Sequence, residues 1–570
     1  MSPKLRLDLF FLVLLALPPG SALFAAVPDA GSIQRDIGDL PSKVPSLQPR
    51  PRLLSPEAPP VEAAASRKTI FVNRFVIEGA TLLTVEVLQH ELFGFTGRNL
   101  TIEEMNSAAD RISATYAKAG YLARIIIPQQ EVQDGAIRLV VVEAKLGRVE
   151  VQKAAGVRFS SERATAYVTS AQPVGAPIRI AELERGLGLL QNNAGFRSSA
   201  IMQIGKAPET SDAVITLEKM PLFDGSIGTD NFGGSSTGIY RTNASLDVNS
   251  PCCIGDRLSL RGMRADGVLF GRAVYTRPIG ISGLQAGLST NMMGYTLGGN
   301  YTNLDVTGDS FSAGTFVTLP LIFSRTSTLF GTIGFDQRLF TDRQHRVAFS
   351  DKRVNAVSVT LSGGWSDAML KGAYTSAGAT LTMGNLDLSR VPDAEAQDLA
   401  TARASGQFRK LSVNLSRMQK LESNRQLVVT LSGQLASGNL DSSEKFSLGG
   451  SSGVRAYPGS EASGDNALLG TVELRHQLTP ALRLFGFYDR GIVQQYSNTW
   501  GGWQSIPGEP NTVSIDGAGL GMLLKPWNTL SIKSTIASRV VSNPGANAQG
   551  KDHDGTRRDP RFWLEAEYSF

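Results

Sequence analysis

One segment of the chain matches a pattern that can carry nucleophilic catalysis. Gly449, Ser451 and Gly453 satisfy Gly-x-Ser-x-Gly, in which a serine on a sharp turn between a strand and a helix becomes an exposed nucleophile. Here a Gly/Ser-rich loop runs directly into Val-Arg-Ala-Tyr-Pro, so the sequence predicts neither flanking element. We therefore interpret the match as incidental and expect no catalytic residue.

Residue types that bind metals or form disulfides are scarce. Cys252 and Cys253 are adjacent, which is closer than an ordinary disulfide allows, and we interpret them as incidental turn residues. Asp552, His553 and Asp554 form a short cluster in a glycine-containing loop, which is typical of solvated side chains. The other histidines are scattered, at His90, His345 and His476. We therefore expect no metal site, no bound cofactor and no enzymatic activity.

Composition indicates a large protein rich in turns and strands. Of the 570 residues, 19% are charged and 59 are glycine, whereas a typical soluble chain is about 25% charged and about 7% glycine. Excess glycine favours turns and strands over helices. The net charge of +5 is spread thinly along the chain, so nucleic acid is not a predicted partner.

The first 26 residues are predicted to be a secretory signal peptide. Lys4 and Arg6 precede an unbroken apolar run over 9–17, and small residues follow over 20–26. The run is shorter than the roughly 20 residues that a membrane-spanning helix needs. The mature protein is therefore expected to be periplasmic, secreted, or inserted in the outer membrane as a barrel.

Prolines dominate the next segment, residues 27–68, which we interpret as a linker. Within it, Ile33, Ile37 and Leu40 recur at helical spacing, so a short helix is predicted over 32–40.

Two mixed segments of similar plan follow, over 69–146 and 147–220. Each reads as a strand, two helices and two further strands, which indicates an internal repeat of a small α+β domain. In the first copy, Thr101 and Glu104 form a predicted capping box, and Gly120 stands where that helix should end.

From residue 221 to residue 570 the apolar residues alternate strictly with polar ones. Val357, Val359 and Leu361 alternate with Ser358 and Thr360, and the same period of two recurs in many later segments. A soluble sandwich would also alternate, but roughly 350 residues is large for one sandwich, and the polar face suits a wet lumen. We therefore predict a membrane β-barrel.

The last strand ends on the final residue. Phe562, Leu564, Ala566, Tyr568 and Phe570 share one face of it. This pattern resembles the sorting signal of bacterial outer-membrane barrels, carried here by Tyr568 and Phe570, and it implies the barrel-assembly machinery as a partner during biogenesis.

The order of signal, proline linker, two small repeats and terminal barrel resembles the hemolysin secretion and activation proteins of two-partner secretion. The resemblance implies a barrel of about sixteen antiparallel strands in outer-membrane lipid. It also implies that the two small α+β units are polypeptide-transport-associated domains in the periplasm.

Two local motifs strengthen the resemblance. Residues 447–465 are similar to the family's long loop, whose core here is Val454, Arg455, Ala456 and Tyr457, and residues 487–491 are similar to its strand motif, here Phe487, Asp489 and Gly491. The family pattern implies that Arg455 on the inward-folded loop pairs with Asp489 on the inner wall. Ala456 departs from the family's glycine, and would be strained by about 1 kcal/mol if that position required a left-handed backbone.

The function that the resemblance implies is export of one large secreted partner protein without nucleotide hydrolysis, the small periplasmic domains binding the partner's N-terminal secretion domain as an extended chain. Sheet-edge addition near 200–205 is a plausible way to bind its extended chain, and the helix over 32–40 is expected to plug the resting pore. A barrel-assembly insertase of the same superfamily is the alternative, although such proteins carry more periplasmic repeats. An outer-membrane barrel enzyme is a second alternative, without a convincing catalytic set.

Overall fold

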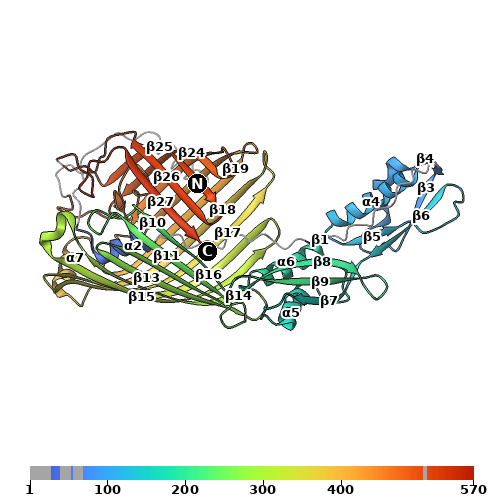
Figure 1. Ribbon diagram of the computed structural model, residues 1–570, viewed down its shortest axis with the longest axis horizontal. Helices are drawn as coiled ribbons and strands as arrows, with labels where there is room; N and C mark the ends of the chain where they lie inside the picture. Colours follow the sequence, from blue (N-terminus) through green and yellow to red (C-terminus); the bar gives the residue numbers. More distant parts are fainter. Residues whose placement is uncertain (1–26, 39–52, 55–68, 505–509, 548) are drawn as a thin grey trace.

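The computed structural model describes residues 27–38, 53–54, 69–504, 510–547 and 549–570. The predicted signal peptide and most of the predicted linker lie outside the described residues. The molecule is elongated, with a large barrel at one end and an arm of two small domains at the other (Figure 1). Within the described residues, no helix combines the length and the apolar character needed to cross a membrane.

Domain 1, at the far end of the arm, is a three-stranded sheet covered by helices. Its sheet order is β3-β6-β5, with β3 parallel to β6 and β5 antiparallel to it. The predicted capping box at Thr101 and Glu104 is present, and Gly120 follows the helix with a φ of +86°. The elements are β2 Ile70–Val72, β3 Arg74–Glu78, α3 Val85–Leu92, the 3₁₀ turn η1 Phe93–Phe95, β4 Arg98–Leu100, α4 Ile102–Lys118, β5 Ala123–Ile126 and β6 Ala136–Glu143.

Domain 2 repeats this plan next to the barrel. Its first, third and second strands lie in the order β7-β9-β8, again parallel and then antiparallel, so the predicted internal repeat has one shared topology. A short strand from the linker, β1 Leu53–Leu54, adds to the outer edge of β8. The elements are β7 Lys145–Lys153, α5 Ser161–Ala171, α6 Ile180–Gln191, β8 Phe196–Ile204 and β9 Thr210–Lys219.

The remaining chain forms a closed antiparallel barrel of sixteen strands, β10 to β20 and β23 to β27, as predicted. Each strand pairs with the next along the chain, and β27 closes the ring on β10 through five residue pairs, Ser226 to Asp230 with Ser569 to Glu565. We call this contact the seam. The early strands are β10 Phe223–Asp230, β11 Arg241–Asn249, β12 Arg257–Ala265, β13 Val268–Ile279, β14 Leu284–Thr296, β15 Val306–Phe323, β16 Ser327–Gln344 and β17 Val347–Asp367.

The later strands complete the ring. They are β18 Ala373–Asp387, β19 Gly406–Lys420, β20 Arg425–Ala436, β23 Asn466–Gln477, β24 Leu482–Gln494, β25 Thr512–Trp527, β26 Leu530–Arg539 and β27 Arg561–Ser569. Between the strands lie η2 Gly299–Leu304, α7 Pro392–Ala400 and the two-residue strands β21 Phe446–Ser447 and β22 Ser463–Gly464. Helix α7 lies at the end of the barrel away from the small domains (Figure 1).

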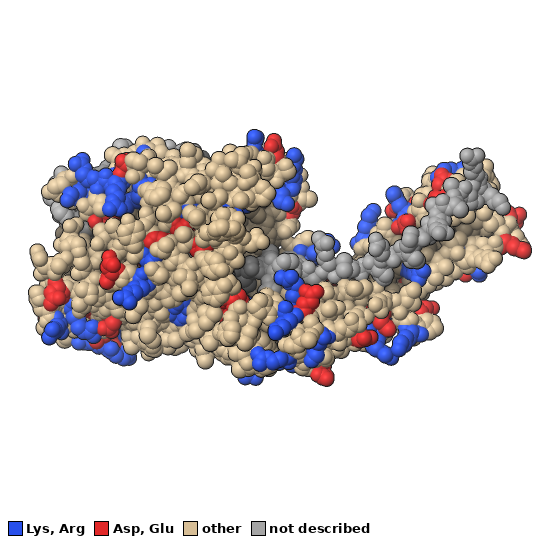
Figure 2. All heavy atoms as spheres, viewed as in Figure 1, with Lys and Arg blue, Asp and Glu red and all other residues tan. Residues whose placement is uncertain are grey.

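The alternating residues take the faces that the sequence predicts for a barrel. Val357, Val359 and Leu361 are exposed on the outside, and so are Val472 and Leu474. Much of the barrel wall in Figure 2 is free of charged side chains. Because a sandwich would bury one face of each sheet against the other, these exposed apolar residues and the closed ring exclude that interpretation.

Three local predictions differ in detail. The first strand expected in 69–146 is broken at Asn73 into β2 and β3, and the first helix expected there begins at Val85. The helix predicted over 32–40 is α2 Ala30–Gly38, while Leu40 lies outside the described residues. Periodicity locates such elements, but their ends depend on contacts with the rest of the fold.

Candidate functional site

A loop that connects β21 to β22 folds back into the barrel. We call residues 448–462 the inward loop. Its Leu448, Val454, Ala456 and Tyr457 are fully buried, and they pack against side chains of the barrel's inner wall. The wall residues of this cluster are Leu469, Phe485, Phe487, Val493, Val513, Ile515 and Ala537.

Arg455 of the inward loop lies against Asp489 of β24. The Nε of Arg455 donates to Oδ2 of Asp489 at 2.9 Å, and its NH2 donates to Oδ1 at 2.8 Å. The backbone N–H of Arg455 donates to the same carboxylate at 3.1 Å. Arg455 is 6% exposed and Asp489 is fully buried. Such a two-pronged, charge-assisted contact is both directional and strong in a dry site.

The same arginine has two further neighbours that the sequence motifs do not include. Its NH1 donates to Glu473 of β23 at 2.8 Å, and its guanidinium carbon lies 3.3 Å from the ring centroid of Phe487. The Nε1–H of Trp563 in β27 donates to the backbone oxygen of Arg455 at 2.7 Å. In the sequence, Glu473 and Trp563 alternate with the outward-facing apolar residues of their strands. This alternation indicated that both side chains point into the barrel, but it did not indicate their contact with Arg455.

Close packing explains three of the motif residues. The φ angle of Ala456 is not positive, so its backbone is not left-handed and the strain considered for this position does not arise. Its methyl group occupies space left by Gly517, where an added Cβ would lie 2.5 Å away. A Cβ on Gly491 would meet Leu448 at 2.6 Å. The hydroxyl of Tyr457 donates to the backbone oxygen of Val541 at 3.4 Å.

Glu461 joins the inward loop to the loop between β26 and β27. Its carboxylate accepts from Nδ2 of Asn543 at 2.8 Å and from the backbone N–H of His553 at 2.8 Å. Burial raises the pKa of Glu461 to about 7, and the nearby Asp552 and Asp554 add to the effect. Our interpretation of Asp552, His553 and Asp554 as solvated is therefore partly wrong. Asp552 is buried, and its Oδ2 lies 3.1 Å from NH2 of Arg561.

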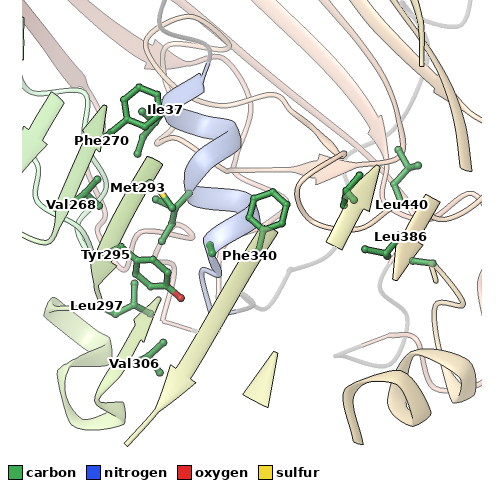
Figure 3. Close-up of a cluster of buried hydrophobic side chains, with 14 of the residues drawn as sticks. Ile37, Val268, Phe270, Met293, Tyr295, Leu297, Val306, Phe340, Leu386 and Leu440 are labelled. Carbon is green, nitrogen blue, oxygen red and sulfur yellow. The ribbon is translucent and has the colours of Figure 1, made fainter. Parts of the chain in front are cut away.

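Helix α2 occupies a different part of the lumen. Ala30, Ile33 and Ile37 are buried in an apolar cluster with residues of β12 to β18. Figure 3 shows the helix lying between Phe270 on one side and Phe340 on the other. The polar Gln34 of the same helix donates to the hydroxyl of Ser312 at 3.1 Å.

Charged groups hold the beginning of α2. The backbone N–H of Ala30 donates to Asp342 of β16 at 2.7 Å, which satisfies a free donor of the helix N-terminus. The Nζ of Lys352 in β17 lies 2.6 Å from Oδ2 of Asp29 and 2.8 Å from Oδ2 of Asp441. Burial alone would raise the pKa of Asp29, but the charge and hydrogen bond of Lys352 hold that pKa well below its ordinary value.

Part of the lumen is not filled by side chains. A cavity of about 900 Å³ lies between α2, the inward loop and the strands at the seam. Hydroxyl and amide side chains such as Ser226, Thr229, Asn243 and Ser245 line it. The lumen of the described chain thus holds two inserts, α2 and the inward loop, beside a cavity that polar side chains line in part.

The final strand also has the predicted faces. Phe562, Leu564, Tyr568 and Phe570 are exposed, whereas Trp563 is buried inside. Phe570 exchanges backbone hydrogen bonds with Gly225 at 3.0 and 3.1 Å, so the last residue takes part in the seam.

Comparisons with known proteins agree with this architecture. Residues 209–521, more than half of the chain, match the family model described as haemolysin secretion/activation protein ShlB/FhaC/HecB, and residues 70–144 match a ShlB-type POTRA domain. The heme/hemopexin transporter protein HuxB of Haemophilus influenzae (strain 86-028NP) is 24% identical over 540 residues, 92% of this chain and 93% of its own.

Solved structures share the fold. CdiB from Escherichia coli superimposes with a TM-score of 0.65 at 19% identity and covers 90% of this chain and 93% of its own. BamA from Haemophilus ducreyi, lacking POTRA domains 1–3, gives 0.54 at 13% identity, covering 88% of this chain and 100% of its own. The chain belongs to the haemolysin secretion/activation protein family, and it is an outer-membrane transporter of two-partner secretion with its small domains in the periplasm.

Proposed function

We propose that the small domains bind an N-terminal secretion domain of one large partner protein as an extended chain, and that the partner then crosses the barrel lumen. The observation that carries this proposal is a polar lumen filled by two inserts that are held in different ways. An extended polypeptide needs a wet conduit, and the inserts need either to stay clear of it or to leave it.

The inward loop is proposed to remain in place during export. Arg455 and Asp489 are its anchor, with Val454, Ala456 and Tyr457 of the loop buried in the adjoining apolar cluster and with Phe487 and Gly491 shaping the wall. Removing one member of a buried charge pair leaves the other uncompensated, which is far more costly than losing an exposed pair.

Helix α2 is proposed to plug the resting pore and to leave it when the partner arrives. Its contacts are one apolar face and a few ion pairs and hydrogen bonds, including Asp29 with Lys352 and Arg35 with the backbone oxygen of Ser442 at 2.9 Å. The cavity lies beside Arg35, Asp36 and Ile37, so water can reach this face of the helix as it leaves.

The energy for export is proposed to come from binding and from folding of the partner outside the cell. The sequence has no phosphate-binding loop, and the family is one of transporters rather than enzymes. Outer-membrane lipid is the proposed surrounding of the exposed apolar wall. The barrel-assembly machinery is proposed to recognise the terminal strand through Tyr568 and Phe570, both of which are exposed.

The experiment compares the culture medium of cells with and without this gene. Loss of a single large secreted protein is expected, with the other outer-membrane barrels at normal levels. A general loss of barrels would instead indicate insertion of other proteins, the alternative function. Re-expression of the parent chain is expected to restore export, and a variant lacking 69–220 is expected to insert as a barrel but to export nothing.

A further inference from the structure

The turn that joins β11 to β12 carries both cysteines of the chain and lies where domain 2 meets the barrel (Figure 1). We call residues 250–256 the cysteine turn. The backbone N–H of Ala194 in domain 2 donates to the backbone oxygen of Gly255 at 3.0 Å. The NH2 of Arg158, also in domain 2, donates to the backbone oxygen of Ser250 at 3.3 Å. The cysteine turn is therefore part of the contact that holds domain 2 on the barrel.

The two surfaces of this contact leave no space between them. A Cβ added to Gly195 of domain 2 would lie 2.7 Å from Cβ of Ser250. A Cβ added to Gly255 of the turn would lie 2.7 Å from Cβ of Asn193 in domain 2. Because neither side has room to shift, a change in the backbone of the cysteine turn must change its contact with domain 2.

The cysteines lie in the part of the turn that fixes its shape. Ser250 and Cys253 have φ angles of +56° and +64°, a left-handed conformation that residues other than glycine rarely adopt. The backbone N–H of Cys253 donates to the backbone oxygen of Ser250 at 3.1 Å. The backbone N–H of Cys252 donates to Oδ2 of Asp256 at 3.1 Å. A new covalent bond between residues 252 and 253 would therefore act on both ends of the turn.

Both thiols are free, and one of them is accessible. Cys252 is exposed and Cys253 is half-buried. The turn lies on the same side of the membrane as domain 2, the periplasm, which is an oxidising compartment. Neighbouring Cα atoms are about 3.8 Å apart, less than the roughly 4.4 Å at which ordinary disulfides begin. A disulfide between the two cysteines would therefore be strained and readily reduced, as regulatory disulfides are.

We propose that Cys252 and Cys253 are a reversible oxidation site, and that the disulfide between them loosens domain 2 from the barrel. The inference goes beyond the proposed function. The contacts described above belong to the chain with free thiols. Closing a ring between residues 252 and 253 changes the backbone between Ser250 and Gly255, so the hydrogen bonds from Arg158 and Ala194 weaken.

The oxidant is a second disulfide, such as oxidised glutathione or a thiol oxidoreductase. The exposed thiolate of Cys252 attacks one sulfur of that disulfide, which forms a mixed disulfide and releases one thiol. The thiolate of Cys253 then attacks Sγ of Cys252 and expels the second thiol. In sum, the two cysteine thiols lose two protons and two electrons, and the oxidant gains them as it becomes two thiols.

The first test is chemical. The purified full chain is incubated with oxidised glutathione, treated with a maleimide and weighed by mass spectrometry. The parent is expected to be two hydrogen atoms lighter and to take no maleimide, and after reduction to take two. Cys253→Ser is the matched variant, because it lacks the second thiol and is expected to retain one glutathione on Cys252. A parent chain that keeps glutathione, or that keeps two free thiols, would overturn the site.

The second test measures the contact through hydrogen exchange of the Ala194 amide. Exchange is expected to be at least several-fold faster in the oxidised chain than in the reduced chain. The amide of Leu122 is the internal control, because it donates to the backbone oxygen of Ile178 at 3.2 Å between the two small domains and is expected to exchange equally in both.

A double variant keeps the chemistry and the contact apart. Cys252→Ser with Cys253→Ser is expected to show the slow exchange of the reduced parent in either buffer. If the disulfide forms in the parent and exchange at Ala194 is unchanged, the loosening is wrong. If the double variant responds to the oxidant as the parent does, the cysteines are not the cause. Both tests use the purified chain alone, so their failure would leave the proposed function intact.

Discussion

The inward loop and helix α2 fill the same lumen but are held by different physics. The loop is fixed by a fully buried carboxylate, a guanidinium with two acidic partners, and four fully buried apolar side chains. The helix has one apolar face, and its Asp29 and Arg35 side chains remain 20% and 12% exposed. The side chains of the helix thus keep some contact with solvent, whereas Asp489 beneath the loop has none, although Asp342 at the start of the helix is also buried. This difference is in line with our proposal that the inward loop stays in place while α2 leaves the lumen.

Breaking the loop's anchor is expected to give the largest effect. Asp489→Asn leaves Arg455 without its two-pronged partner, and loss of one member of a buried pair costs about 3–5 kcal/mol. Secretion of the partner is expected to fall below one-tenth, measured in the medium against barrel content in the outer membrane. Arg425→Ala is the control, because its contact with Glu422, at 3.7 Å, is exposed on both sides. Normal secretion by the Asp489 variant would refute the anchor.

Weakening the helix's hold is expected to act in the opposite direction. Lys352→Met removes the cation between Asp29 and Asp441, and the loss of these charged hydrogen bonds is expected to destabilise the docked helix by about 1.5–3 kcal/mol. The pore is expected to open more often in planar bilayers while the barrel stays folded. Arg390→Ala, which affects a more exposed contact with Asp351 at 3.2 Å, is expected to leave conductance unchanged. Fewer openings in the Lys352 variant would show that α2 does not close the pore.

The docking of the inward loop and the docking of α2 are expected to depend differently on pH. The pKa of Glu461 is raised from 4.5 to about 7, so its contribution to loop docking is fully present below about 4.5 and is lost as the pH rises through about 7, a change of about 1–3 kcal/mol. The pKa of Asp29 is lowered instead, so its contribution is lost only in more acidic solution.

The measurement is protease or label access to the loop between β26 and β27 from pH 5 to pH 8. Access is expected to increase with pH in the parent chain, and Glu461→Gln is expected to flatten the profile. Pore opening through release of α2 is expected to change little over this interval. If the dependence of access on pH is the same in the Glu461→Gln variant and in the parent chain, Glu461 does not control the contact between the two loops.

The smallest effect is expected at the connection between the loop and the seam. Trp563→Phe keeps the ring but removes the donor to the backbone oxygen of Arg455, at a cost of about 1 kcal/mol. A drop of a few degrees in the unfolding temperature of the barrel is expected, with secretion reduced no more than several-fold. Leu564→Val is the control on the same strand, since its side chain is exposed. Equal stability of the two variants would deny the indole a role in holding the loop.

Much of the fold follows from local sequence. The capping box at Thr101 and Glu104 and the alternation around Val359 depend on neighbours a few residues apart, so the sequence predicts the helix and the strand directly. The site is only partly local. Arg455 and Asp489 were expected from motif resemblance, whereas Glu473 could be seen only as an unexplained charge on an inward face.

By itself, the sequence determined the kinds of elements, their order and which face of each strand is apolar, because hydrophobic periodicity and turn chemistry act over short separations. Only the tertiary structure decided which distant residues meet: Trp563 with Arg455, Lys352 with Asp29, β1 with β8 and β10 with β27. Those contacts join residues from about a hundred to more than three hundred positions apart, and their energies depend on burial and geometry that exist only after the barrel has closed.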